Sequence, residues 1–217
     1  MPPTDRFVIS FAAEPPQDSL PYGRRAELLR QHFLEAAAQI DGDGDELGEA
    51  GEIRWFPDRT YCGRTFVPAT ARTDKGFEFY GYVSYIESQE GEGAGEFLSF
   101  ADYTGDVAEN NPDWKLDINE ETIDYWRGEN DNSAEMTLIW GTPLLPGGAI
   151  VTAELADLAV DQCAVSDERF TLIAADNYRG DYLEIKLWGA RGNRLASESL
   201  YDEDDDSSDD AEGAGAE

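Results

Sequence analysis

The sequence has few of the side chains on which metal sites and nucleophilic catalysis depend. It contains one histidine, His32, and two cysteines, Cys62 and Cys163, which lie far apart in the chain. Zinc sites need several such ligands at short spacings, so we expect no zinc centre. We expect the cysteines to be thiols buried as small apolar residues, and a single disulfide between them is the alternative.

Motifs that position a nucleophile or a phosphate group are also absent. A serine or cysteine triad would have to use His32, which lies at the edge of an apolar helical stripe, and no GxSxG elbow accompanies it. Neither GxxxxGKS/T nor GxGxxG occurs in the chain. Carboxylates are the only abundant side chains that could act in catalysis. Because there are so many of them, the sequence does not single out any pair as a candidate site.

Positive charge is scarce. Lysine and arginine together number 16 against 47 acidic residues, which gives a net charge of −31. Nine of the acidic residues follow Tyr201, so a charge of −22 remains on residues 1–201. Binding of nucleic acid requires basic side chains, and anionic membranes repel acidic proteins. We therefore expect no direct nucleic-acid or membrane partner, and we expect protein partners, basic ones included, in a homo-oligomer or a hetero-assembly.

Lysine is rarer than arginine, with three lysines against thirteen arginines. Lysine depletion with dispersed acidic residues is typical of adaptation to high salt, where ions screen the self-repulsion. A surface that docks a basic partner or imitates a phosphate backbone is a second interpretation, and the base composition of the genome is a third. The one basic cluster in the sequence is formed by Arg24, Arg25 and Arg30.

Long hydrophobic runs are missing, and no segment approaches the length that a membrane helix needs. The first residues lack a charged region followed by an apolar one, so we expect no secretory signal. We therefore expect a soluble protein in the cytoplasm or in an assembled particle. Hydrophobic residues still make up 41% of the chain, which is enough for a buried core.

What is present is mostly strand-like. Residues 24–40 carry an apolar stripe at helical spacing, while residues 6–12 and most segments after residue 52 alternate with period two. Residues 77–86 are apolar on both faces, as in a central strand, and residues 90–96 form a turn to a strand at 97–103. Further strands are expected at residues 52–56, 61–67, 135–140, 149–160, 169–174, 182–188 and 194–201, and residues 149–160 also suit a helix.

A short helix is expected at residues 120–127. Asn119 is a good N-cap, Gly128 follows the last turn, and Ile118 and Ile123 stand where a hydrophobic staple would close. The elements together predict a mainly β fold, an antiparallel β-sandwich or jelly-roll-like body with one long covering helix and one short helix. An α+β fold is the alternative.

The expected organisation is a single domain. It spans residues 1–201, with the strand and helix of residues 6–40 packed on the β body and an acidic linker at 41–52. A disordered acidic tail, 202–217, is expected to follow.

The most specific local pattern lies in that linker. Asp41, Asp43 and Asp45 stand at the first, third and fifth positions of a twelve-residue stretch that ends in Glu52. This spacing resembles the calcium loop of the EF-hand, with Glu46 where that family has glycine and a strand where it has its second helix. The resemblance implies a Ca²⁺ or Mg²⁺ site at these four carboxylates. A solvated acidic linker is the interpretation that we favour, and we expect no other cofactor.

For function, the scarcity of histidine, metal spacings and phosphate loops favours a non-enzymatic structural or interaction protein, a subunit of a larger assembly with a salt-adapted surface. An acidic inhibitor or chaperone of a nucleic-acid-binding protein, acting by charge mimicry, is one alternative. A carboxylate-based hydrolase is the other. The hydrolase hypothesis predicts a pocket with two inward carboxylates, one of them with a raised pKa.

Overall fold

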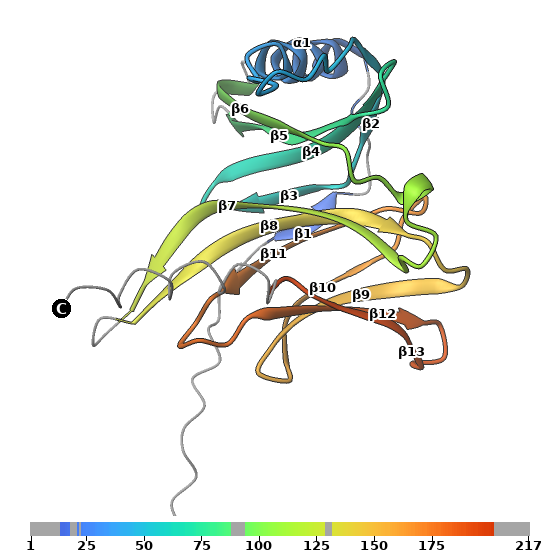
Figure 1. Cartoon of the computed structure of the whole chain (residues 1–217). Coiled ribbons are helices and arrows are strands. Elements are labelled where there is room, and N and C mark those ends of the chain that lie inside the picture. The colour runs from blue at the N-terminus through green and yellow to red at the C-terminus, as the bar shows by residue number, and fades with distance from the viewer. Residues whose placement is uncertain (1–13, 18–20, 22, 88–93, 129–131, 202–217) are drawn as a thin grey trace, which may run out of the picture.

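A computed structural model of the chain describes residues 14–17, 21, 23–87, 94–128 and 132–201. These residues form one α-helix, one short 3-10 turn and thirteen strands, and every strand pair is antiparallel (Figure 1). The mainly β fold with a long covering helix is therefore confirmed. In the described part of the chain, no helix combines the length and apolar character needed to cross a membrane.

The strands are arranged in three sheets. The first sheet has the order β1-β3-β4-β5-β6, with β2 also paired to β4, and consists of β1 (Glu14–Gln17), β2 (Ala50–Trp55), β3 (Asp58–Tyr61), β4 (Arg64–Thr73), β5 (Glu78–Glu87) and β6 (Ala94–Thr104). The second has the order β11-β8-β7 and consists of β7 (Leu116–Arg127), β8 (Ser133–Pro143) and β11 (Phe170–Asp176). The third has the order β10-β9-β12-β13 and consists of β9 (Gly148–Leu155), β10 (Leu158–Ala164), β12 (Leu183–Gly189) and β13 (Arg194–Ser199).

Helix α1 (Gly23–Ala37) covers the outer face of the first sheet (Figure 1). Its apolar stripe buries Leu29, Phe33 and Ala37, in agreement with the helical spacing of the sequence. The stripe packs on the side chains of β4 and β5 that point toward the helix, and together they form the helix-side core: Leu29, Phe33, Ala37, Val67, Ala69, Ala71, Phe79, Val83 and Tyr85. The helix ends at Ala37, before the expected residue 40, because the chain tightens there into i→i−3 hydrogen bonds from Gln39 and Ile40.

The second sheet lies between the first and third sheets (Figure 1). A larger core fills the space around it and includes Phe56, Phe66, Trp140, Phe170 and Ile185. The central strand β5 contributes to both cores, since Phe79 faces the helix while Tyr80 and Tyr82 pack against the larger core. The prediction of a central strand with two apolar faces is confirmed.

The prediction of a short helix at residues 120–127 is wrong. These residues belong to β7, which pairs with β8 from Leu116 opposite Pro143 to Arg127 opposite Ser133. The capping signals are local and weak, whereas pairing with the buried strand β8 satisfies the backbone along the whole segment. A bulge between Thr122 and Asp124 interrupts the alternation of β7.

Other expectations have mixed outcomes. The turn from β5 to β6 is confirmed, and residues 149–160 lie in the hairpin β9–β10 rather than in one element. Strand β1 pairs with β3, and β12 pairs with β13. Lys186 of β12 is buried, and its Nζ lies 2.6 Å from a carboxylate oxygen of Glu154 and 3.0 Å from one of Glu184. The strand at 6–12 and the tail at 202–217 lie outside the described residues.

Candidate functional site

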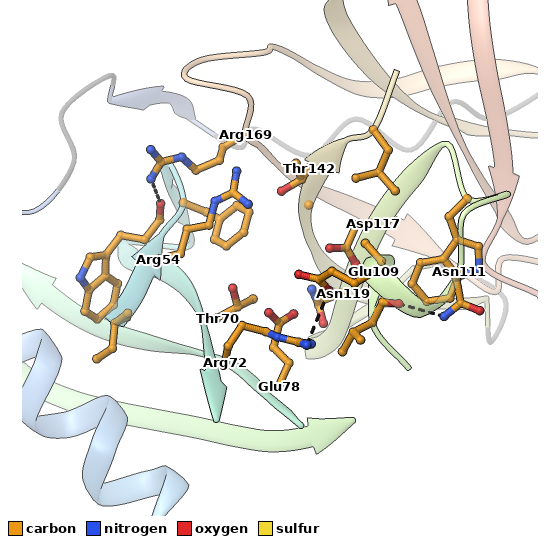
Figure 2. A pocket seen from close by; sticks show the side chains of 18 of the residues that line it. Arg54, Thr70, Arg72, Glu78, Glu109, Asn111, Asp117, Asn119, Thr142 and Arg169 are labelled. Atoms are coloured by element: carbon orange, nitrogen blue, oxygen red, sulfur yellow. Dashed lines mark hydrogen bonds and ion pairs between the residues drawn. The ribbon is translucent and has the colours of Figure 1, made fainter. Parts of the chain in front are cut away.

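A cleft of about 1000 Å³ opens between one end of the first sheet and the neighbouring end of the second (Figure 2). Strands β2, β4 and β5 form one side, and β7 and β8 form the other. The connection from β6 to β7, which carries the 3-10 turn η1 (Ala108–Asn110), also lines it. The cleft is thus the open end of the interface between two sheets, a position at which ligand sites commonly occur.

The alternation of the strands decides which side chains of the first sheet enter the cleft. On β2, Ile53 and Trp55 pack against the helix-side core, so Arg54 points to the opposite face. On β4, the neighbours of buried Ala71 are Thr70 and Arg72, and both line the cleft. In each of these strands, the residues between those that face the helix therefore point into the cleft.

The second sheet contributes its residues by register. Asp117 of β7 lies opposite Thr142 of β8, and both line the cleft. The next pair on that face is Asn119 and Trp140, and the Trp140 ring lies 6.4 Å from the ring of Tyr80 on β5. This face of the second sheet therefore points toward the first sheet.

Two arginines on one side of the cleft form no ion pair with a carboxylate of the described residues. The guanidinium of Arg54 lies over the ring of Phe56 at 5.7 Å, and Nη1 of Arg169 donates to the carbonyl oxygen of Trp55 at 2.6 Å. Among the described residues, no carboxylate lies within 4.0 Å of either guanidinium. Figure 2 shows the two groups on the same side of the cleft. Burial and the neighbouring charge of Arg54 lower the pKa of Arg169.

A tight turn positions Arg169. The turn joins β10 to β11, and its central residues Asp167 and Glu168 have positive φ angles of 48° and 60°. This conformation is that of a two-residue hairpin connection, closed by mutual backbone hydrogen bonds between Ser166 and Arg169. Arg169 is therefore held at the first position after a rigid turn.

Two carboxylates line the cleft from different sheets, Glu78 from β5 of the first sheet and Asp117 from β7 of the second. Burial raises the pKa of Glu78 to about 7, with a further contribution from the charge of Asp117. Burial also raises the pKa of Asp117. Figure 2 shows both groups beside the ion pair of Arg72 and Glu109, whose nearest atoms are 3.6 Å apart. At neutral pH, Glu78 is therefore divided between its protonated and ionised forms.

The third cleft arginine is only partly satisfied. Arg72 uses Nη2 in its ion pair with Glu109, and its Nη1 is buried without a hydrogen-bond partner in the described structure. A buried donor without an acceptor is costly, and such atoms in a cleft indicate a place for a bound polar group.

The four carboxylates of the EF-hand-like stretch lie on an exposed loop and on the strand that follows it. Asp41, Asp43 and Asp45 are exposed on the loop before β2, where the backbone N–H of Asp43 donates to Oδ1 of Asp41 at 3.2 Å. Glu52 is exposed within β2, since pairing with β4 extends the segment that would be the second helix of an EF-hand. No group of three or more histidine, cysteine or acidic residues suited to a metal ion occurs in the described residues. The cation site stays a prediction without support from this geometry.

His32 and the two cysteines lie outside the cleft. His32 stacks on Phe97 with ring centroids 4.6 Å apart, as a residue at the edge of the helix would. Both cysteines are free thiols, so a disulfide between them is wrong. Cys163 is buried as expected, whereas Cys62 is exposed in the turn between β3 and β4.

Of the candidate site residues taken from the sequence, Glu52 lines the cleft, while its arginines were missed. Sequence reasoning singled out the arginines that are close together on α1, whereas the cleft collects Arg54, Arg72 and Arg169 from β2, β4 and the turn before β11. The available signal is a charged residue on the inner face of a strand, as at Arg72 and Glu78. In a chain with 47 acidic residues, that signal does not separate Glu78 from the others.

Comparison of the chain with protein-family models, with curated proteins and with solved structures found no match.

Proposed function

We propose that the protein binds a small organic anion in the cleft. The observation that carries the proposal is the pair Arg54 and Arg169, which line the cleft with no carboxylate of the described residues within 4.0 Å, in a chain whose net charge is −31. Guanidinium groups match carboxylates and phosphates in geometry and bind them through charge-assisted hydrogen bonds. A bound anion would also relieve the repulsion between the two guanidiniums.

Calorimetric titration with succinate, citrate and inorganic phosphate tests the proposal. We expect millimolar or tighter binding of at least one probe, and Arg54→Gln should weaken it about tenfold, since one charged hydrogen-bonding group contributes about 1.5 kcal/mol or more. Arg54 suits this test because it is exposed and takes part in no ion pair of the described residues, and its guanidinium lies over the ring of Phe56. Arg30→Gln, at an exposed position on α1, is the matched control. Equal affinity of Arg54→Gln and the wild type would refute the proposal.

A carboxylate-based hydrolase is a second candidate function for the same cleft. The supporting observation is that Glu78 holds a proton near neutral pH while Asp117 lies beside it, which is the division of roles that a general acid and its partner carboxylate need. Turnover of a panel of chromogenic glycosides and esters is the test. We expect Glu78→Gln to reduce turnover about 100-fold or more. The candidate fails if no substrate of the panel is hydrolysed or if Glu78→Gln remains fully active.

The assembly role expected from the sequence is a proposal about the outer surface. Strands β7 and β13 each pair on one side only in the described sheets, and a groove of about 570 Å³ separates them. Leu116 and Ile118 line this groove with Leu200, so it offers both unpaired backbone and apolar surface. Light scattering measures the oligomeric state and tests this role in KCl from about 0.15 M, roughly physiological ionic strength, to about 2 M. A monodisperse monomer throughout this range would count against it.

Charge mimicry also remains a proposal. It is supported by the acidic surface alone, and it predicts a basic protein that is retained on the immobilised chain at low salt and released at high salt. Retention of no basic protein at low salt would exclude it.

A further inference from the structure

We infer that the ligand of the cleft is a zwitterion that carries a carboxylate and an ammonium group, an amino acid or a short peptide. The inference rests on the proposed anion-binding function and specifies its ligand. The cleft carries groups of both charges. Arg54 and Arg169 lie together in one part of it, and Glu78 and Asp117 lie in another part, beside the ion pair of Arg72 with Glu109 (Figure 2).

The positive side matches a carboxylate. Arg54 projects from β2, and Arg169 is fixed by its hydrogen bond to the carbonyl oxygen of Trp55 on the same strand. The two guanidiniums therefore approach the cleft from neighbouring positions, as two donors to one carboxylate would. The remaining donors of Arg169 and all those of Arg54 have no carboxylate acceptor in the described structure.

The negative side matches an ammonium group. Glu78 comes from β5 of the first sheet and Asp117 from β7 of the second, so the two carboxylates meet across the cleft rather than along one strand. The other charged groups that act on Glu78 are Arg72 of β4, Glu109 of η1 and Arg54 of β2. Arg72 lies in an ion pair with Glu109, and no cation lies within 4.0 Å of Glu78 or Asp117 in the described residues.

The charge of the whole chain favours a zwitterion over a simple anion. A chain with a net charge of −31 repels a free anion at long range, and the two carboxylates repel it again inside the cleft. A zwitterion has no net charge, so the long-range repulsion disappears. Its ammonium group also adds a positive charge next to Glu78 and Asp117, where Arg72 is already paired with Glu109. The cleft volume of about 1000 Å³ is sufficient for a short peptide as well as for a single amino acid.

The two kinds of ligand should move protons in opposite directions. An ammonium group next to Glu78 favours its ionised form, so binding of a zwitterion near pH 7 should release a proton. A plain anion in the cleft favours the protonated form, so its binding should take up a proton. The sign of the proton change therefore reports which group faces Glu78.

The experiment titrates the full chain in unbuffered KCl at pH 7 and follows the proton change with a pH electrode, alongside calorimetry. The probes are glycine, triglycine, succinate and ethylamine. We expect glycine or triglycine to bind at least about tenfold tighter than succinate or ethylamine and to release a proton, because each charged contact contributes on the order of a factor of ten. Glu78→Gln should abolish the proton release, and Arg54→Gln should weaken glycine and triglycine but not ethylamine.

Arg30→Gln is the control and should behave as the wild type. Asp117→Asn is the second variant for the carboxylate side, and it should also weaken the binding of glycine and triglycine. If succinate binds as tightly as glycine and triglycine and takes up a proton, the zwitterion inference is wrong while anion binding survives. If ethylamine binds as tightly as the zwitterions, the arginine side takes no part and the inference is wrong. If no probe binds, both the inference and the proposed function are wrong.

Discussion

Two features of the environment of Glu78, burial and a neighbouring carboxylate, favour its protonated form. It lies half-buried at the start of β5, on the same face as Tyr80 and Tyr82, and Asp117 adds a like charge nearby. Together these raise its pKa from 4.5 to about 7. Between these two values the folded protein holds a proton that the unfolded chain has released, so Glu78 makes the stability fall as the pH rises through this range and leaves it unchanged above.

The first prediction concerns this proton. Between pH 5 and pH 8, the free energy of unfolding of Glu78→Gln should rise relative to the wild type by about 1–2 kcal/mol, because the amide does not titrate. Urea denaturation of both proteins at pH values of about 5, 6, 7 and 8 measures the difference in the free energy of unfolding. Glu87→Gln, an exposed position at the other end of β5, is the control and should follow the wild type. Parallel profiles for Glu78→Gln and the wild type would contradict the prediction.

At the scale of elements, the position of β7 depends on a glycine in its neighbour. Gly141 lies in β8 between Ile118 of β7 and Phe170 of β11. A Cβ atom there would collide with the backbone oxygen of Asp117 and would lie 2.9 Å from Cζ of Phe170. The close approach of β7 to β8, which holds Asp117 in the cleft, therefore requires a residue without a side chain.

The second prediction is that Gly141→Ala destabilises the fold by about 1–3 kcal/mol, the usual cost of overpacking, and weakens ligand binding by displacing Asp117. Urea denaturation and calorimetric titration are the measurements. Gly95→Ala in β6 is the control, because nothing lies within 4 Å of the added Cβ and the φ angle there is not positive. An unchanged midpoint for Gly141→Ala would show that β7 can shift freely.

One buried ion pair connects all three sheets. Arg59 of β3 donates through Nη2 to Oδ2 of Asp161 on β10 at 2.6 Å, and the same oxygen accepts from the backbone N–H of Ile173 on β11 at 3.0 Å. The exposed fractions of the two charged side chains are 2% and 13%. Because both charges have lost much of their hydration, each depends on the other.

The third prediction is that Arg59→Met destabilises the fold by about 3–5 kcal/mol, since Asp161 would be left buried and unpaired. The double variant Arg59→Met with Asp161→Asn should be less destabilised than the sum of the single changes, because the charge that needs a partner is gone. Lys75→Met, which removes an exposed pair with Glu46, is the control and should change stability by less than about 0.5 kcal/mol. Denaturant midpoints decide the result, and equal losses for Arg59→Met and Lys75→Met would contradict it.

At the scale of the whole molecule, net charge dominates the physical behaviour. The first 201 residues carry −22 once the nine acidic residues after Tyr201 are set aside. Most ion pairs of the described surface involve exposed carboxylates, as for Lys75 with Glu46 and Arg64 with Glu96, and such pairs contribute little. Self-repulsion therefore opposes the folded state whenever counterions are dilute.

The fourth prediction is that the melting temperature rises with KCl between low salt and 2 M. The rise should be roughly 5 °C or more, which corresponds to about 2 kcal/mol for a chain of this size, because the screening length falls from tens of ångströms to about 3 Å. Circular dichroism melts measure it, with sorbitol at equal osmolality as the control for excluded-volume effects. A melting temperature independent of KCl would favour the acidic surface as a binding device over adaptation to salt.

The spacing of apolar residues in the sequence was sufficient to predict the elements in which that spacing matches the pattern of burial. The stripe of α1 and the two apolar faces of β5 were readable because period and burial coincide there. The segment 120–127 was misread because its capping signals are local, while its partner β8 supplies the pairing from outside the segment. The burial of Lys186 in β12 could not be read from its own strand, because its partner Glu154 lies on β9.

The sequence by itself determined the charge, the size of the apolar fraction and the scarcity of histidine and cysteine, since these are properties of composition. Only the tertiary structure decided which acidic residues lose their hydration and which basic residues lack an anion. Glu78 and Asp117 are desolvated because two sheets meet around them, and Arg54 and Arg169 share one side of a cleft because β2 and the β10–β11 turn converge there. Desolvation and unpaired charge arise from contacts between distant segments, which composition and period do not encode.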